Sequence, residues 1–325
     1  MFVVAAVAGA QSATTTYLTD LNGVRVQGIS STTSKDGEKT ERWQSINGRQ
    51  VPLEQVTEKV IREDANGKVT EKTIRRFDAT GQPSTPERVV TEETKLAGGG
   101  STVRSTTYQT DINGNVTPAE RRTVETRVQG TTTTAQTVVE RPSMNGSFNT
   151  VEKRTAATNG TEANRSTTES VYRSDGNGGF REELRYVKTV ATSGDQTIEN
   201  TADYEPGLTG RLELHAQSSS TVRKLPDGSE VSEVNLYSSN VPGRLQDNLA
   251  AQQIKEQQII ERRVLPNGSV TETLSVRRPS ISDPTRLGDL QKLSETVCTG
   301  KCVPDKPAPT PPPAPAKPAA GNSRP

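Results

Sequence analysis

The chain has 325 residues and a formal net charge of +1, and 24% of its residues are charged, 29% apolar and 3% aromatic. Ordinary globular domains carry roughly 45–50% apolar residues with glycine included, so this composition excludes a thick hydrophobic core. The balanced charge leaves no basic footprint for nucleic acid, and we predict no nucleic-acid partner. Charges of both signs are interspersed with alternating Thr and Val, a pattern that favours strands over disorder.

The first ten residues, "MFVVAAVAGA", form a short apolar run that ends in a small-x-small pattern. Such a pattern is typical of a signal-peptidase site, so we predict that residues 1–10 are the remnant of a signal peptide cleaved after Ala10. The alternative is a frayed apolar tail. No other run approaches the ~18 apolar residues of a membrane-spanning helix. The sequence therefore predicts a secreted, periplasmic or cell-surface protein without a transmembrane helix.

Residues 11–200 contain a repeat marked by glycines. Gly48, Gly81, Gly114 and Gly146 are separated by 33, 33 and 32 residues, and Gly178 follows after another 32. A second set of glycine turns lies midway between them, at Gly67, Gly98 to Gly100, Gly130, Gly160 and Gly194. One unit is thus two long segments joined by two turns, which indicates a hairpin repeat.

The segments between the turns alternate as strands do. In "VTETLSVRR", for example, Val270, Leu274 and Val276 share one face. Glu, Arg and Thr dilute even the more apolar faces, so each strand buries little. We predict an all-β fold, a long antiparallel meander of ~33-residue hairpin repeats that is either an open sheet or curled on itself. Its cohesion comes from ladder hydrogen bonds and from cross-strand Glu–Arg and Thr–Thr pairs, each worth about 0.2–1 kcal/mol.

The motif Asp-x-Asn-Gly occurs repeatedly between alternating segments. A calcium loop is one interpretation, but it needs 6–8 oxygen ligands and, in the EF-hand, Glu at position twelve. Counting from Asp111, that position is Arg122. Asp first and Gly fourth instead fit a type I turn in which Gly takes the left-handed position. We predict structural turns at Asp20, Asn22, Gly23, Asp64, Asn66, Gly67, Asp111, Asn113, Gly114, Asp175, Asn177 and Gly178.

The pattern loosens in residues 201–297, which we interpret as more divergent β repeats. Leu245, Leu249 and Ile254 have loosely helical spacing and predict one short helix between Leu245 and Ile260. Residues 298–325 begin with "CTGKC" and continue as a Pro/Ala-rich segment typical of a disordered tail. In an exported chain we expect Cys298 and Cys302 to form a local disulfide.

The sequence offers no convincing active site. Its single histidine, His215 in "LELHAQ", lies in a strand pattern with no nucleophile motif beside it. We therefore name no catalytic, cofactor-binding or metal-binding residue. The sequence predicts an exported, non-enzymatic repeat protein with a structural or adhesive role at the cell surface, envelope or matrix. Its partner would be itself, through sheet edges, or a surface polysaccharide or protein.

Two other functions stay open. One is a polysaccharide- or protein-binding module that acts through a polar sheet face or an open edge strand. The other is a carbohydrate-active enzyme on a β scaffold, in which a few carboxylates would do the chemistry.

Overall fold

A computed structural model describes residues 10–19, 24–34, 38–96, 98–111, 113–238, 253–280, 282–283, 285–300 and 302. These residues form strands and turns only, which confirms the all-β prediction. Within them, no helix has the length and apolarity needed to cross a membrane. Residues 1–9 of the predicted signal peptide, the first Asp-x-Asn-Gly motif at Asp20 and the Pro/Ala-rich segment after Cys302 lie outside the described residues, whereas Ala10, the last residue of that predicted peptide, begins the first strand.

Eighteen strands follow one another along the chain. Their bounds are β1 (Ala10–Thr19), β2 (Arg25–Ser34), β3 (Lys39–Ile46), β4 (Arg49–Asp64), β5 (Gly67–Arg76), β6 (Glu87–Lys95), β7 (Ser101–Thr110), β8 (Val116–Gln129), β9 (Thr132–Pro142), β10 (Phe148–Gly160), β11 (Asn164–Ser174), β12 (Phe180–Ser193), β13 (Gln196–Pro206), β14 (Leu212–Lys224), β15 (Glu230–Ser238), β16 (Gln253–Val264), β17 (Val270–Arg277) and β18 (Gln291–Gly300).

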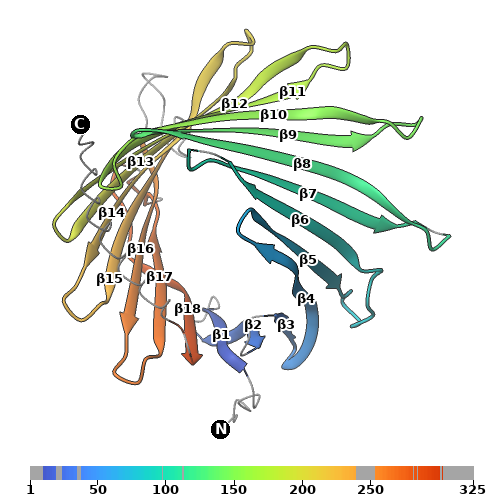
Figure 1. Ribbon diagram of the computed structural model, residues 1–325. Coiled ribbons are helices and arrows are strands. Elements are labelled where there is room, and N and C mark those ends of the chain that lie inside the picture. Colours follow the sequence, from blue (N-terminus) through green and yellow to red (C-terminus); the bar gives the residue numbers. More distant parts are fainter. Residues whose placement is uncertain are drawn as a thin grey trace, which may run out of the picture.

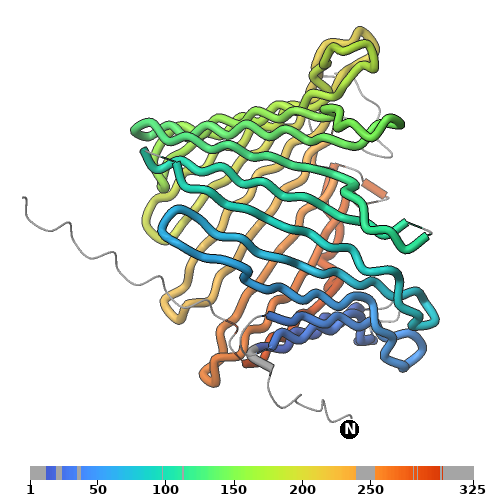
Figure 2. Tube along the Cα trace, turned by 45° about the vertical axis from the view of Figure 1, so that its right-hand side comes forward, coloured from blue at the N-terminus to red at the C-terminus, as the bar shows by residue number. Residues whose placement is uncertain are grey.

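Each strand pairs antiparallel with the next, and β18 returns to pair with β1, so that the meander closes into a barrel (Figure 1). The long antiparallel meander of hairpin repeats is thereby confirmed, and of the two predicted shapes the curled one is realised. The start of β1 lies opposite the end of β18, so both lie at one end of the barrel, here called the terminal end. The opposite end is called the distal end (Figure 2).

The two sets of glycines found in the sequence belong to the two ends of the barrel. The set that includes Gly48, Gly114 and Gly146 turns odd-numbered strands into even-numbered ones at the distal end. The midway set, with Gly130 and Gly194, makes the opposite connections at the terminal end. All five of these glycines have positive φ between 60° and 83°, a conformation that side-chain-bearing residues rarely adopt.

The closed sheet has two faces, here called its two walls. The strand register aligns side chains of the same face on neighbouring strands, so each wall is continuous around the barrel. The buried apolar residues all lie on one of them: Val51, Val139, Val171, Val190, Val270 and Val276. This face is the inner wall, since side chains that point toward the axis of a closed sheet converge and cover one another. None of the large described side chains is fully buried. The described barrel is thus a single-layer wall with no packed core, as expected for so many strands.

Polar rungs cross the inner wall from strand to strand, as the sequence predicted. Hydroxyl pairs link neighbouring strands, for example Thr158 with Thr167 at 2.9 Å and Thr201 with Ser218 at 2.6 Å. A chain of ion pairs crosses β3 to β6. Glu54 binds both Arg42 at 3.6 Å and Arg76 at 3.7 Å, and Arg76 also binds Glu87 on β6 at 3.2 Å. Partly exposed pairs of this kind each contribute little, so the cohesion is distributed over many weak contacts in register.

Two sequence predictions are wrong. The expected helix around Ile254 is instead the start of β16, because Gln253–Val264 pairs with both β15 and β17; residues 239–252 lie outside the described part. The second error concerns open edge strands. Every described strand has a neighbour on both sides, so the described barrel offers no edge for strand addition or self-association.

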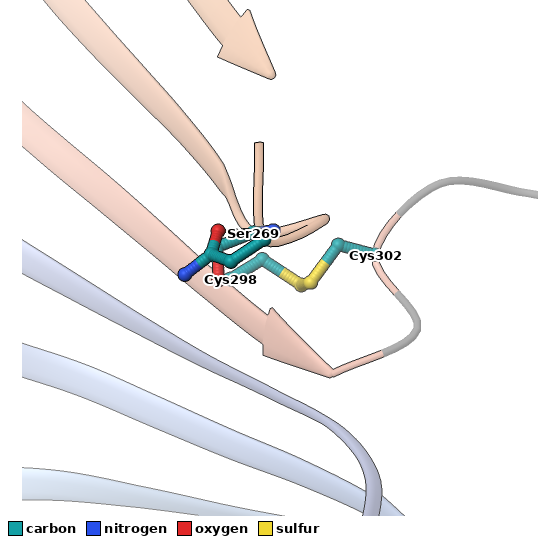
Figure 3. The surroundings of a disulfide bond; sticks show 4 residues. Ser269, Cys298 and Cys302 are labelled. Carbon is teal, nitrogen blue, oxygen red and sulfur yellow. Dashed lines mark hydrogen bonds between the residues drawn. A yellow bond between two sulfur atoms is a disulfide. The ribbon is translucent and has the colours of Figure 1, made fainter. Parts of the chain in front are cut away.

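The predicted disulfide is confirmed. Cys298 and Cys302 are bonded at the terminal end of β18, beside Ser269 in the β16–β17 turn (Figure 3). Ser269 is buried there, and its carbonyl accepts a hydrogen bond from the N–H of Leu265 at 2.9 Å. The bond ties Cys302 back to the last strand, two residues before that strand ends.

Removing this disulfide should have a small effect. The two cysteines are only 4 positions apart, and the loop-entropy relation then gives about 2 kcal/mol as the stabilisation lost in a Cys298→Ser, Cys302→Ser variant. Thermal unfolding followed by circular dichroism should show a melting point a few degrees lower with an unchanged native spectrum. Loss of the native spectrum at 25 °C would contradict this expectation.

Candidate binding surface at the distal end

The structure puts the Asp-x-Asn-Gly residues in hairpin turns. In the β7–β8 turn the Asp111 carboxylate accepts hydrogen bonds from the backbone N–H of Asn113 and Asn115, both at 2.8 Å, and Gly114 has a φ of 83°. A further hydrogen bond from the Asn115 side chain is the main cause that lowers the pKa of Asp111. The carboxylate oxygens are thus engaged by the turn itself.

The two other described copies differ in detail. Asp175 accepts from the N–H of Asn177 at 2.8 Å, and Gly178 again has positive φ, at 90°. Asp64 accepts from Asn66 at 2.9 Å and Gly67 at 3.0 Å, but Gly67 does not take the left-handed conformation. No group of three or more Asp, Glu, His or Cys residues in the described part could hold a metal ion.

His215 sits at a β-bulge in β14, between the pairs Asp203–Ala216 and Tyr204–Leu214. Its side chain is 63% exposed, and its Nδ1 lies 3.8 Å from the Glu205 carboxylate. On the adjacent strand, Asp203 has a buried Oδ1 without a hydrogen-bond partner. Burial raises the pKa of the Asp203 carboxyl above its ordinary 3.8, while the charge of His215 acts in the opposite direction.

Asp203 should therefore destabilise the barrel when it is ionised. An acid whose pKa is raised in the folded state loses stability as pH rises through that pKa. We expect Asp203→Asn to raise the melting temperature at pH 7, and the gain to vanish below about pH 3.8, where Asp203 is protonated in both states. Asp195→Asn, at an exposed turn position, is the matched control and should show no such gain. An equal gain at both pH values would refute the role of the buried charge.

The strands place nearly all their aromatic side chains together. Except for Tyr186, every aromatic residue in the described strands lies on the outer wall, within three residues of the distal end of its strand. We call this set the outer aromatic belt: Tyr17, Trp43, Tyr108, Phe148, Tyr172, Phe180, Tyr204 and Tyr237. All of its members are half-buried. A surface that gathers the scarce aromatic residues of a chain is a candidate binding surface.

A recurring irregularity accompanies the belt. The register shifts at Tyr108, Tyr172, Tyr204 and Tyr237, so that an extra residue is inserted in the facing strand beside each tyrosine. Three of these extra residues, Ala119, Glu183 and His215, are separated by multiples of 32 positions, the period of the repeat. Bulges re-aim side chains and increase local twist, so the repeat presents each tyrosine in a similar way.

Cations cover several rings of the belt. The guanidinium of Arg25 lies 3.6 Å from the ring centroid of Tyr17, and that of Arg121 lies 3.9 Å from Phe148. The Lys153 ammonium is 4.0 Å from the Phe180 ring, and Arg88 is 5.4 Å from Tyr108. These distances are typical of cation–π contacts. The belt is therefore a row of aromatic–cation pairs rather than an apolar stripe.

One part of the belt is hollowed. A depression of about 210 Å³ lies on the outer wall across β6, β7 and β8, lined by Val90, Glu92, Arg104, Thr106, Tyr108, Pro118 and Arg121. Within the described part of the chain, the side chains of Arg104 and Arg121 make no hydrogen bond or ion pair, and the Arg121 guanidinium lies over the ring of Phe148. The hollow thus combines an aromatic ring with two guanidinium groups that are free to bind an anion.

Comparison with known proteins does not extend this description. No protein-family model matches the chain, and no curated protein matches its sequence. The candidate surface therefore rests on its own geometry.

Proposed function

We propose that the protein is an exported, non-enzymatic repeat protein with a structural or adhesive role at the cell surface, envelope or matrix. The observation that carries this proposal is the difference between the two ends of the barrel. The start of β1 and the end of β18 lie at the terminal end, while the outer aromatic belt rings the distal end. One end is thus available for attachment and the other for contact.

The construction of the wall supports a mechanical role. Its cohesion is spread over ladder hydrogen bonds and polar rungs such as Thr33–Thr40 and Lys188–Glu199, so the barrel does not depend on one core. The disulfide between Cys298 and Cys302 fits an oxidising compartment. In this proposal the Pro/Ala-rich sequence after Cys302 serves as the spacer between the barrel and its attachment point.

A fractionation experiment tests the proposal. In the producing organism, the mature chain should begin at Gln11 and accumulate with the envelope, the matrix or the culture medium. Chain that retains Met1 and stays in the cytoplasm would refute export. Purified protein should also leave polysaccharides intact, and hydrolysis by a soluble monomer would refute the non-enzymatic assignment.

A second candidate function, a binding module on the outer wall, is favoured by the belt and its hollow. Such a module could not bind its partner through an open edge strand, because the described sheet is closed. Binding would have to use the outer face, where the aromatic–cation pairs lie.

A further inference from the structure

We infer that the hollow at Tyr108, together with the neighbouring part of the outer aromatic belt, binds an acidic polysaccharide. The inference rests on the proposed surface role, and it names the class of partner that the contact end would recognise. Its basis is the combination of one stacking platform with two free guanidinium groups on a single exposed wall.

The size of the hollow indicates that it holds one unit of a longer ligand rather than a whole small molecule. A pocket that encloses a whole drug-sized molecule usually measures about 300–1,000 Å³, whereas this hollow measures about 210 Å³. It lies on an outer wall and spans three neighbouring strands, so a chain can continue past it on either side. An extended polymer that places one sugar unit here fits better than a small free metabolite.

The chemistry of the lining indicates a sugar carrying a carboxylate. The ring of Tyr108 is half-buried and offers a flat apolar face of the kind on which rings stack. Arg104 and Arg121 project from the adjacent strands β7 and β8, and guanidinium groups bind carboxylates through two parallel hydrogen bonds. Glu92 is the one acidic group in the lining, so the lining carries a net positive charge.

The belt offers more than one such contact. Arg121 of the hollow also lies over the ring of Phe148, and one further pair, Lys153 with Phe180, continues around the rim. Paired strands are about 4.8 Å apart, so the rings of Tyr108 on β7, Phe148 on β10 and Phe180 on β12, which are three and two strands apart, each lie about 10–14 Å from the next along the rim. A polymer lying along the rim would meet several of them, and linked weak contacts add up to useful avidity.

The test measures binding of the full chain to polygalacturonate, with neutral dextran as the comparison ligand. We expect polygalacturonate to bind at least tenfold more tightly than dextran, and binding to weaken with added salt. Arg104→Gln combined with Arg121→Gln should reduce affinity at least tenfold, and Tyr108→Ala several-fold. Arg223→Gln is the matched control, because Arg223 is an exposed, unpaired outer-wall arginine at the terminal end; it should change affinity less than twofold. Unchanged melting temperatures would show that all variants fold.

Four outcomes would overturn the inference. They are no binding to polygalacturonate, equal binding to dextran, equal loss in the Arg223→Gln control, and preferential binding to phosphatidylglycerol vesicles. Fractionation separates these failures from failure of the proposed function. A chain found at the cell surface that binds no acidic polysaccharide would refute only the ligand class, whereas a cytoplasmic chain would refute the surface role itself.

Discussion

Replacing Thr296 with proline should open the barrel at β18, the strand that closes the meander onto β1. Thr296 lies in the middle of β18, where it pairs with Thr16 on one side and Glu272 on the other. Proline cannot donate to the ladder and is tolerated in sheets only at edges or bulges. The carbonyl left without its donor costs roughly 1–3 kcal/mol, and the ring adds steric conflict with the neighbouring strand.

The consequence should be a change of assembly as well as of stability. A meander opened at its seam presents two long unpaired edges, and such edges recruit other chains. Light scattering after size-exclusion chromatography should detect species larger than those of the wild type. Thr296→Val keeps the backbone N–H and loses only the 3.1 Å hydroxyl contact with Thr16, so it should cost about 1 kcal/mol and leave the assembly unchanged. A proline variant that elutes and melts like the wild type would show that the seam does not hold the sheet closed.

The hairpins could be predicted from the sequence because their signals are local. Gly114 follows Asp111 within one turn, and the alternation of Val124, Thr126 and Val128 lies within one strand. Closure has no such signal. The seam joins residues as distant as Thr16 and Thr296, 280 positions apart, and their Thr-containing strands resemble others of the chain, such as β7 and β9. Only the accumulated twist and curl of the whole sheet bring them together.

The outer aromatic belt was not predicted from the sequence, although a local signal for it exists. The low aromatic content argues against a packed core, but the positions of the aromatic residues relative to the turns indicate where on the sheet they lie. Tyr17, Tyr108 and Tyr172 each lie three residues before the Asp of an Asp-x-Asn-Gly or Asp-Gly-Asn-Gly turn. Because a turn fixes which face of the preceding strand points outward, this constant offset indicates one shared wall and one shared end. The cations over the rings come from other strands, so their placement requires the register.

Gly67→Ala should be among the most damaging single-methyl additions to this barrel. A Cβ on Gly67 would lie 2.0 Å from the carbonyl oxygen of Glu93 on β6 and 3.0 Å from its carbonyl carbon. The obstacle is backbone within a paired strand, so no side chain can move aside to relieve it. Overpacking of this kind costs typically 1–3 kcal/mol, which should lower the melting temperature by several degrees.

Alanine variants of two other glycines distinguish the cost of this steric clash from the cost of an unfavourable backbone conformation. Gly114 has a φ of 83° but nothing within 4 Å of the position that a methyl group would occupy, so Gly114→Ala should cost only the roughly 1–2 kcal/mol of the left-handed conformation. Gly288 has neither problem, since its nearest neighbour is the Arg278 carbonyl oxygen at 3.4 Å. Its alanine variant should stay within about 0.5 kcal/mol of the wild type. If Gly67→Ala were no worse than Gly288→Ala, the tight contact between β5 and β6 would be refuted. The fourth position of the Asp-x-Asn-Gly motif thus has two distinct reasons to be glycine, conformation at Gly114 and close approach at Gly67.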